Sequence, residues 1–99
     1  MKEVLLKGFN DRELTCYLFD DVSSAKGVVA IVHGMQEHAL RYSDFAKFLN
    51  DNGYVVFAPD LRGHGKNMTD GKPGFEDGDI YMDIVEDFKI FLANLNNEY

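Results

Sequence analysis

The sequence predicts an α/β fold, in which helices pack against a sheet that contains parallel strands. Two short apolar runs, residues 28–32 and 54–58, consist mainly of β-branched and aromatic residues and are typical of buried strands. Between them lies a helical i, i+3, i+4, i+7 pattern of apolar residues, formed by Tyr42, Phe45, Ala46 and Leu49. Strand, helix and strand form one βαβ unit, so we expect parallel strands with a right-handed crossover.

The size and composition fit one small globular domain. The chain has 99 residues, of which 45% are apolar, 13% aromatic and 27% charged, and this excludes collagen-like and disordered chains. Seventeen acidic residues against ten basic residues give a formal charge of −7. Because an acidic surface repels phosphate backbones, we expect no nucleic-acid partner.

The first predicted element is a β-hairpin of residues 2–8 and 13–20. An apolar run at residues 4–6 is followed by a turn at Asn10 and Asp11, residue types that tolerate left-handed backbone geometry. Leu14, Cys16 and Leu18 then alternate with the side chains between them, as in a strand. A polar loop connects this hairpin to the strand at residues 28–32.

The helix between the parallel strands is expected to begin near Ser43 and to end at Asn52-Gly53. Pro59 closes the second strand, and residues 60–79 form a glycine-rich surface loop. Apolar residues at helical spacing then predict a second helix over residues 80–95. Acidic residues lie at its start, where the helix dipole favours negative charge.

The predicted sheet is incomplete. A strand as apolar as residues 28–32 is expected to have a neighbour on each edge and helices on both faces. An apolar edge without a neighbour favours pairing with another strand. The sequence therefore predicts an open edge that could bind a second copy or another chain.

The single cysteine excludes an internal disulfide, and it predicts a reducing, cytoplasmic location. Cys16 lies in the middle of a predicted strand, where we expect a buried structural thiol rather than a nucleophile. The N-terminal residues do not resemble a signal peptide, and residues 28–32 form the longest strictly apolar run. That run is far too short for a membrane span.

Two motifs follow the two predicted parallel strands. The first is His33-Gly34-Met35-Gln36-Glu37-His38, with Arg41-Tyr42 shortly after it, and the second is Asp60-Leu61-Arg62-Gly63-His64-Gly65. In this order they resemble the N-terminal part of an α/β-hydrolase of the monoacylglycerol lipase and lysophospholipase-like type, also described as the serine aminopeptidase S33 type. The resemblance implies that residues 1–99 are the N-terminal portion of such a domain and end before the nucleophile strand.

The resemblance also implies a role for the first turn. Hydrolysis of an ester passes through an oxyanion, which fixed backbone N–H groups can stabilise. By resemblance, the Met35 N–H is one such donor, while His33 and Gly34 support the turn. Gly34 is expected to allow a sharp bend. The alternative is that His33-Gly34 only ends a strand.

The second motif is expected to fix the loop that follows the strand at residues 54–58. Arg62 can form a charge-assisted bond with a carboxylate or a carbonyl, and Gly63 and Gly65 allow tight packing beside Asp60. The family usually has serine two residues beyond the second glycine, where this chain has Asn67. His38 and His64 are expected to be structural or exposed.

Serine hydrolases carry a Gly-x-Ser-x-Gly motif, and the 99 residues contain none. Ser23, Ser24 and Ser43 do not follow a predicted buried strand. We therefore expect the catalytic triad outside residues 1–99 and no activity from this chain alone. The complete enzyme would act on a monoacylglycerol, a lysophospholipid or a similar small acyl ester. The alternative is a non-enzymatic interaction module, or a truncated remnant, that pairs through the open sheet edge.

Cofactor motifs are not matched. Gly63-His64-Gly65 lacks the third glycine of a dinucleotide fingerprint, because Met68 occupies that position, and no Walker-type P-loop fits. His33, Glu37 and His38 do not have an established zinc-ligand spacing. We therefore expect neither a cofactor nor a metal.

Overall fold

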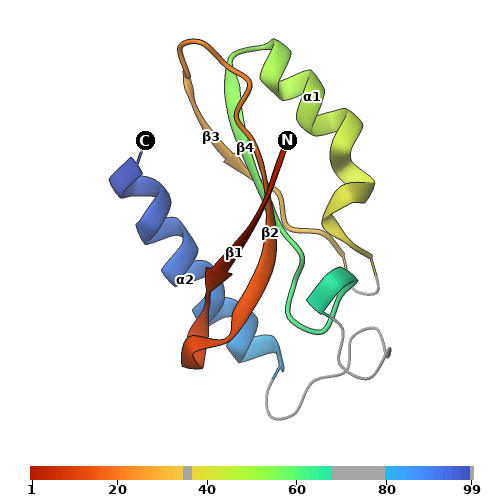
Figure 1. Ribbon diagram of the computed structural model, residues 1–99, viewed down its shortest axis with the longest axis vertical. Helices are drawn as coiled ribbons and strands as arrows, with labels where there is room; N and C mark the ends of the chain where they lie inside the picture. Colours follow the sequence, from red (N-terminus) through yellow and green to blue (C-terminus); the bar gives the residue numbers. More distant parts are fainter. Residues whose placement is uncertain (35–36, 68–79, 99) are drawn as a thin grey trace.

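The computed structural model describes residues 1–34, 37–67 and 80–98. It contains six main elements (Figure 1): β1 (Lys2–Lys7), β2 (Glu13–Phe19), β3 (Gly27–Ala30), α1 (Ser43–Asp51), β4 (Tyr54–Pro59) and α2 (Ile80–Glu98). Three short 3₁₀ turns join them: η1 (Phe9–Asp11), η2 (Ala39–Tyr42) and η3 (Gly65–Asn67). Each predicted strand and helix is therefore present, close to its expected bounds. Most of the predicted loop, residues 68–79, lies outside the described residues.

The four strands form one mixed sheet with the order β1-β2-β4-β3. β1 and β2 form the predicted antiparallel hairpin, in which Val4 lies opposite Cys16. β2 is also antiparallel to β4, whereas β3 and β4 are parallel. The predicted hairpin and the parallel βαβ unit are both confirmed, and the architecture is α/β.

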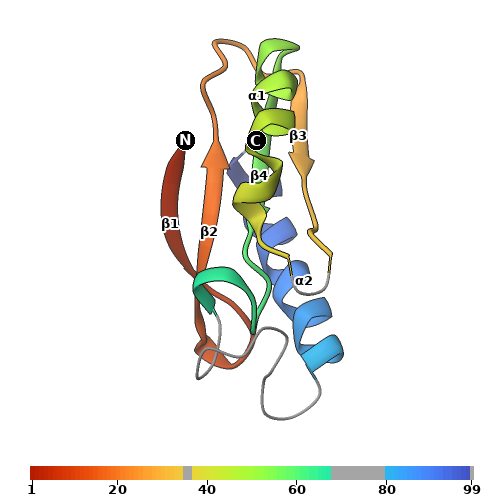
Figure 2. The same ribbon diagram turned by 90° about the vertical axis from the view of Figure 1, so that its right-hand side faces the viewer.

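The two helices cover opposite faces of the sheet (Figure 2). Alternate residues of β4 point to opposite faces, so Val56 belongs to the cluster beneath α1, whereas Phe57 contacts α2. Phe57 meets Phe91 of α2 edge to face, with ring centroids 5.5 Å apart. β4 is consequently the buried centre of the domain.

Cys16, in β2, is buried as predicted and belongs to the core cluster beneath α2. It is fully buried, and its Sγ contacts the Leu14 carbonyl at 3.6 Å. Burial, with the nearby Asp60 and Asp87 carboxylates as smaller causes, raises the pKa of this thiol to about 12. Because the thiolate is the nucleophilic form, Cys16 is a structural residue.

β3 differs from its prediction as a strand buried on both faces. It ends at Ala30, its four residues are only half-buried, and Val32 is 59% exposed. The Ile31 N–H still donates to the Phe57 carbonyl at 2.9 Å, so the chain follows β4 slightly beyond the strand. Within the described residues β3 pairs only with β4, and its other edge is open as predicted.

α2 is longer than predicted and continues to Glu98. Its inner face presents Asp87 and Phe91, both almost fully buried, whereas Val85 and Leu92 are exposed. No helix in the described parts of the chain combines the length and the apolar character needed to cross a lipid bilayer.

Candidate functional site

The candidate site lies where the chain leaves the carboxyl ends of β3 and β4. Open α/β sheets bind ligands at this end of parallel strands. His33 follows β3, and its buried ring joins the two exits: Nε2 accepts the Leu61 N–H at 2.9 Å, and Nδ1 lies 2.8 Å from the Gly34 carbonyl oxygen. The first motif is thereby fastened directly to the second.

These contacts define the protonation state of His33. A backbone N–H can only donate, so Nε2 must be the unprotonated acceptor and Nδ1 must carry the proton. The ring is therefore neutral. Burial is the main cause that lowers the pKa of His33 below its ordinary value. His33 is a structural link between the strand ends and has no nitrogen available for proton transfer.

Glu37 closes the turn that begins at His33. Its Oε1 accepts the Gly34 N–H at 2.6 Å and the Tyr42 hydroxyl at 2.9 Å, while Oε2 lies 3.2 Å from Nε of Arg41. The hydrogen bond from Gly34, followed by that from Tyr42, lowers the pKa of the Glu37 carboxyl. From the sequence, Glu37 was part of the first motif and was rejected as a zinc ligand, and its contact with the Gly34 N–H was not predicted. The i, i+4 spacing of Glu37 and Arg41 bears only on their ion pair, and no sequence signal indicates the Gly34 contact.

The described glycines with a left-handed φ do not include Gly34. A Cβ at this position would lie 2.7 Å from Oε1 of Glu37, so a larger residue would displace the end of that side chain. The sharp bend expected at this glycine stays a prediction, and the close approach of a carboxylate is a second feature of the position. Met35, the expected oxyanion donor, lies outside the described residues.

Asp60 organises the second motif from a buried position. Its Oδ1 accepts the Ala39 N–H at 2.7 Å, and its Oδ2 accepts the Lys66 N–H at 3.1 Å. One carboxylate thereby accepts a backbone N–H from each of η2 and η3. Gly65 is required here, because its φ is +53° and a Cβ would lie 2.3 Å from Asp60 Oδ2. Gly63 also has a left-handed φ, of +79°.

Asn67 extends the sheet with its side chain. Its Oδ1 accepts the Thr15 N–H at 2.9 Å, and its Nδ2 donates to the carbonyls of Asp60 at 2.7 Å and Thr15 at 3.3 Å. The β2–β4 pairing ends where Cys16 lies opposite Pro59, the last residue of β4. The Asn67 amide bonds the next residue of β2, Thr15. A serine hydroxyl has one donor and could not make all three bonds. Sequence analysis treated Asn67 only as a departure from the family pattern.

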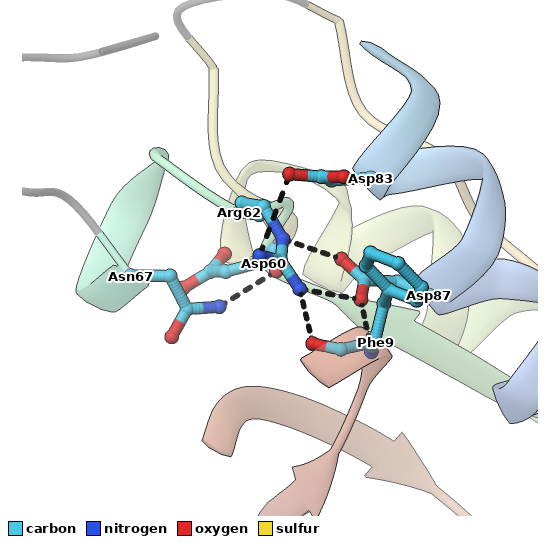
Figure 3. A network of polar contacts seen from close by, with 6 residues as sticks. All are labelled: Phe9, Asp60, Arg62, Asn67, Asp83 and Asp87. Carbon is cyan, nitrogen blue, oxygen red and sulfur yellow. Dashed lines mark hydrogen bonds and ion pairs between the residues drawn. The ribbon is translucent and has the colours of Figure 1, made fainter. Parts of the chain in front are cut away.

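Arg62 connects this end of the sheet to α2 (Figure 3). Its Nε and Nη2 donate to the two carboxylate oxygens of Asp87 at 3.0 and 2.8 Å, and Nη2 also donates to the Phe9 carbonyl at 3.0 Å. Asp87 in turn accepts the Phe9 N–H, and Asp83 lies 3.8 Å from Nη1. The bonds to Asp87 raise the pKa of Arg62. The hairpin turn, β4 and α2 therefore meet at one buried ion pair.

The other two histidines differ in environment. His38 is exposed, whereas His64 is fully buried, with Nδ1 3.1 Å from the Arg62 carbonyl oxygen and its ring 5.2 Å from that of His33. In the described part of the chain, Nε2 of His64 has no hydrogen-bond partner. Within the same residues, no three His, Cys, Asp or Glu side chains form a group that could bind a metal.

Within the described residues, this end of the sheet presents two hydrogen-bonded chain exits rather than a reactive side chain. His33 and Glu37 hold the first turn, whereas Asp60, Arg62 and Asn67 hold the second. His33 is neutral and fully bonded, and the Cys16 thiol is buried with a raised pKa. Fixed backbone N–H groups can stabilise developing negative charge, and the described contacts hold the chain on either side of residues 35 and 36.

Comparison with known proteins places this geometry in a family. The model of a family described as serine aminopeptidase, S33, matches residues 23–99. A monoacylglycerol lipase of Mycolicibacterium smegmatis is 35% identical over 74 residues, which are 75% of this chain and 25% of that protein. A monoglyceride lipase of Rattus norvegicus is 28% identical over 82 residues, which are 83% of this chain and 23% of that protein. The chain thus spans about a quarter of the length of these relatives.

Solved structures agree with the fold. A thermostable carboxyl esterase from Bacillus coagulans, solved in complex with glycerol, superposes with a TM-score of 0.79 at 28% identity. The match covers 99% of this chain and 32% of the esterase. A structure described as a lipase in its open form has a TM-score of 0.61 at 34% identity, over 67% of this chain and 22% of that one.

Proposed function

The chain belongs to the serine aminopeptidase S33 family, and from this premise we propose that it is the N-terminal segment of a serine ester hydrolase. The proposed substrate is a monoacylglycerol, a lysophospholipid or a similar small acyl ester. The names of the matched relatives, a monoacylglycerol lipase and a monoglyceride lipase, support this class of substrate. A carboxyl esterase with the same fold supports the carboxylic ester bond.

The observation that carries the proposal is the turn at the carboxyl end of β3. His33 fastens its start to the exit of β4, and Glu37 holds its far side. A turn held in this way can present a backbone N–H without reorganisation when negative charge develops on a carbonyl oxygen. We assign this donor to Met35, following the family resemblance.

The proposed reaction is acyl transfer in two steps. A serine hydroxyl attacks the ester carbonyl, the alcohol leaves, and water then hydrolyses the acyl-enzyme. The Met35 N–H would stabilise the oxyanion in both tetrahedral intermediates. Residues 1–99 contain no Gly-x-Ser-x-Gly motif, so the serine, its base and its acid would come from outside this sequence.

Two assays test this proposal. The purified chain, incubated with a chromogenic acyl ester, should show no turnover above a denatured control. A hybrid in which this chain replaces the matched N-terminal segment of the Mycolicibacterium smegmatis lipase should hydrolyse a monoacylglycerol. Turnover by the chain alone, or a folded hybrid without activity, would contradict the proposal.

The open edge of β3 favours a second candidate function, a non-enzymatic interaction module. β3 contains only glycine, valine and alanine, without the charges or proline that protect many edge strands. A partner strand, from a second copy or another chain, could pair there. Native mass spectrometry separates the candidates, because a stable monomer over a wide concentration range would count against self-pairing.

A further inference from the structure

We propose that Glu37 is a positioning residue that binds the Gly34 amide and so removes this N–H from the possible oxyanion donors. The inference rests on the proposed function for its purpose, but its geometry stands independently. An amide that already donates to a carboxylate is not available to a second anion. Glu37 would therefore select which backbone N–H of the turn faces the substrate.

Both peptide groups of Gly34 are engaged in the turn. The Gly34 N–H donates to Oε1 of Glu37 at 2.6 Å, and the Gly34 carbonyl accepts the Glu37 N–H at 3.2 Å. The same carbonyl accepts the proton on Nδ1 of His33 at 2.8 Å. In a capping box, two residues three apart each accept the backbone N–H of the other. Gly34 and Glu37 bond in a similar way, with the Gly34 carbonyl in place of one side chain. These bonds restrain both the N–H and the carbonyl of Gly34.

Two further side chains orient the Glu37 carboxylate. The Tyr42 hydroxyl donates to the same Oε1 at 2.9 Å, and the Arg41 guanidinium lies 3.2 Å from Oε2. Both residues belong to η2, whose Ala39 N–H is bound by buried Asp60. The orientation of Glu37 therefore depends on the core of the domain, although the Glu37 side chain is 23% exposed.

The space around Gly34 gives a second argument. A Cβ on Gly34 would lie 2.7 Å from Oε1 of Glu37, and φ of this residue is not in the left-handed region. The absence of a side chain thus leaves room for the carboxylate to lie directly against the Gly34 backbone.

Proton nuclear magnetic resonance of the ¹⁵N-labelled 99-residue chain tests the proposal without any activity. The charged or titratable groups around the carboxylate are the Arg41 guanidinium, the neutral His33 ring and the Tyr42 phenol. At neutral pH the Gly34 amide proton should resonate downfield of an unstructured glycine, because it donates to a carboxylate. On acidification it should move upfield with a midpoint below 4.5, the ordinary value for Glu37.

Two variants and a control make the outcome specific. Glu37→Gln should abolish the acid-range movement of the Gly34 resonance, and Tyr42→Phe should shift its midpoint to higher pH by removing a donor to the carboxylate. Glu13→Gln, at an exposed position at the start of β2, should leave the titration unchanged. An unstructured Gly34 shift at neutral pH, or an unchanged titration in Glu37→Gln, would overturn the proposal. Neither result depends on whether the family activity is assigned correctly.

Discussion

Replacing Asp87 with alanine should strongly destabilise the domain. The substitution removes three hydrogen bonds, two from Arg62 at 2.8 and 3.0 Å and one from the Phe9 N–H at 2.8 Å. It also leaves the Arg62 side chain, only 5% exposed, without its main counter-ion. Removing one partner of a buried ion pair typically costs about 3–5 kcal/mol. Asp83 lies 3.8 Å from Nη1 and can compensate in part, so we expect a loss of about 3 kcal/mol in the free energy of unfolding.

The assay is urea unfolding at neutral pH, followed by far-ultraviolet circular dichroism. The control is Lys89→Ala, which breaks an exposed pair on α2 and should cost less than about 1 kcal/mol. A double variant, Arg62→Leu with Asp87→Leu, should recover much of the loss, because neither charge of the pair is then left buried without its partner. If Asp87→Ala and Lys89→Ala cost the same, the ion pair does not connect α2 to the sheet as described.

Three further outcomes follow from the structure. Asn67→Ala leaves the buried Thr15 N–H unpaired and should cost about 1–3 kcal/mol in urea unfolding, whereas exposed Asn52→Ala should cost far less. The Cys16 thiol, with its pKa raised to about 12, should react with a disulfide reagent at mildly alkaline pH only after urea unfolds the chain. Because burial lowers the pKa of folded His33 below 6.5, the unfolded state binds its proton first as pH falls. The contribution of neutral His33 to the free energy of unfolding is therefore complete above pH 6.5 and declines as the pH falls below that value. In His33→Gln, the free energy of unfolding should decline less over the same pH range.

The sequence was informative about the fold because local patterns coincide with the tertiary structure. The apolar run at residues 54–58 became the buried central strand β4, and the helical spacing around Ala46 became α1. Residues 28–32 carry the same kind of pattern, yet β3 lies at an edge. An apolar pattern records which surfaces a strand is suited to bury, whereas its actual burial depends on which neighbours are present.

The site was less predictable, because its contacts join residues far apart in the chain. Arg62 was expected to bind a carboxylate or a carbonyl, but its partners, Asp87 and Phe9, are identified only by the fold. The pairing of Asn67 with Thr15 spans 52 residues and leaves no local signal. Glu37 belongs to the first motif, but nothing in the motif indicates that its carboxylate accepts the Gly34 N–H.

The hybrid lipase gives the most direct test of the proposed oxyanion donor at Met35, in the turn after His33. Met35→Pro removes the backbone N–H, whereas Met35→Ala retains it, so the ratio of their kcat values isolates the amide. We predict that Met35→Pro lowers kcat by about 10²–10³-fold, with Met35→Ala close to the parent hybrid. Equal kcat values for the two folded variants would contradict the claim.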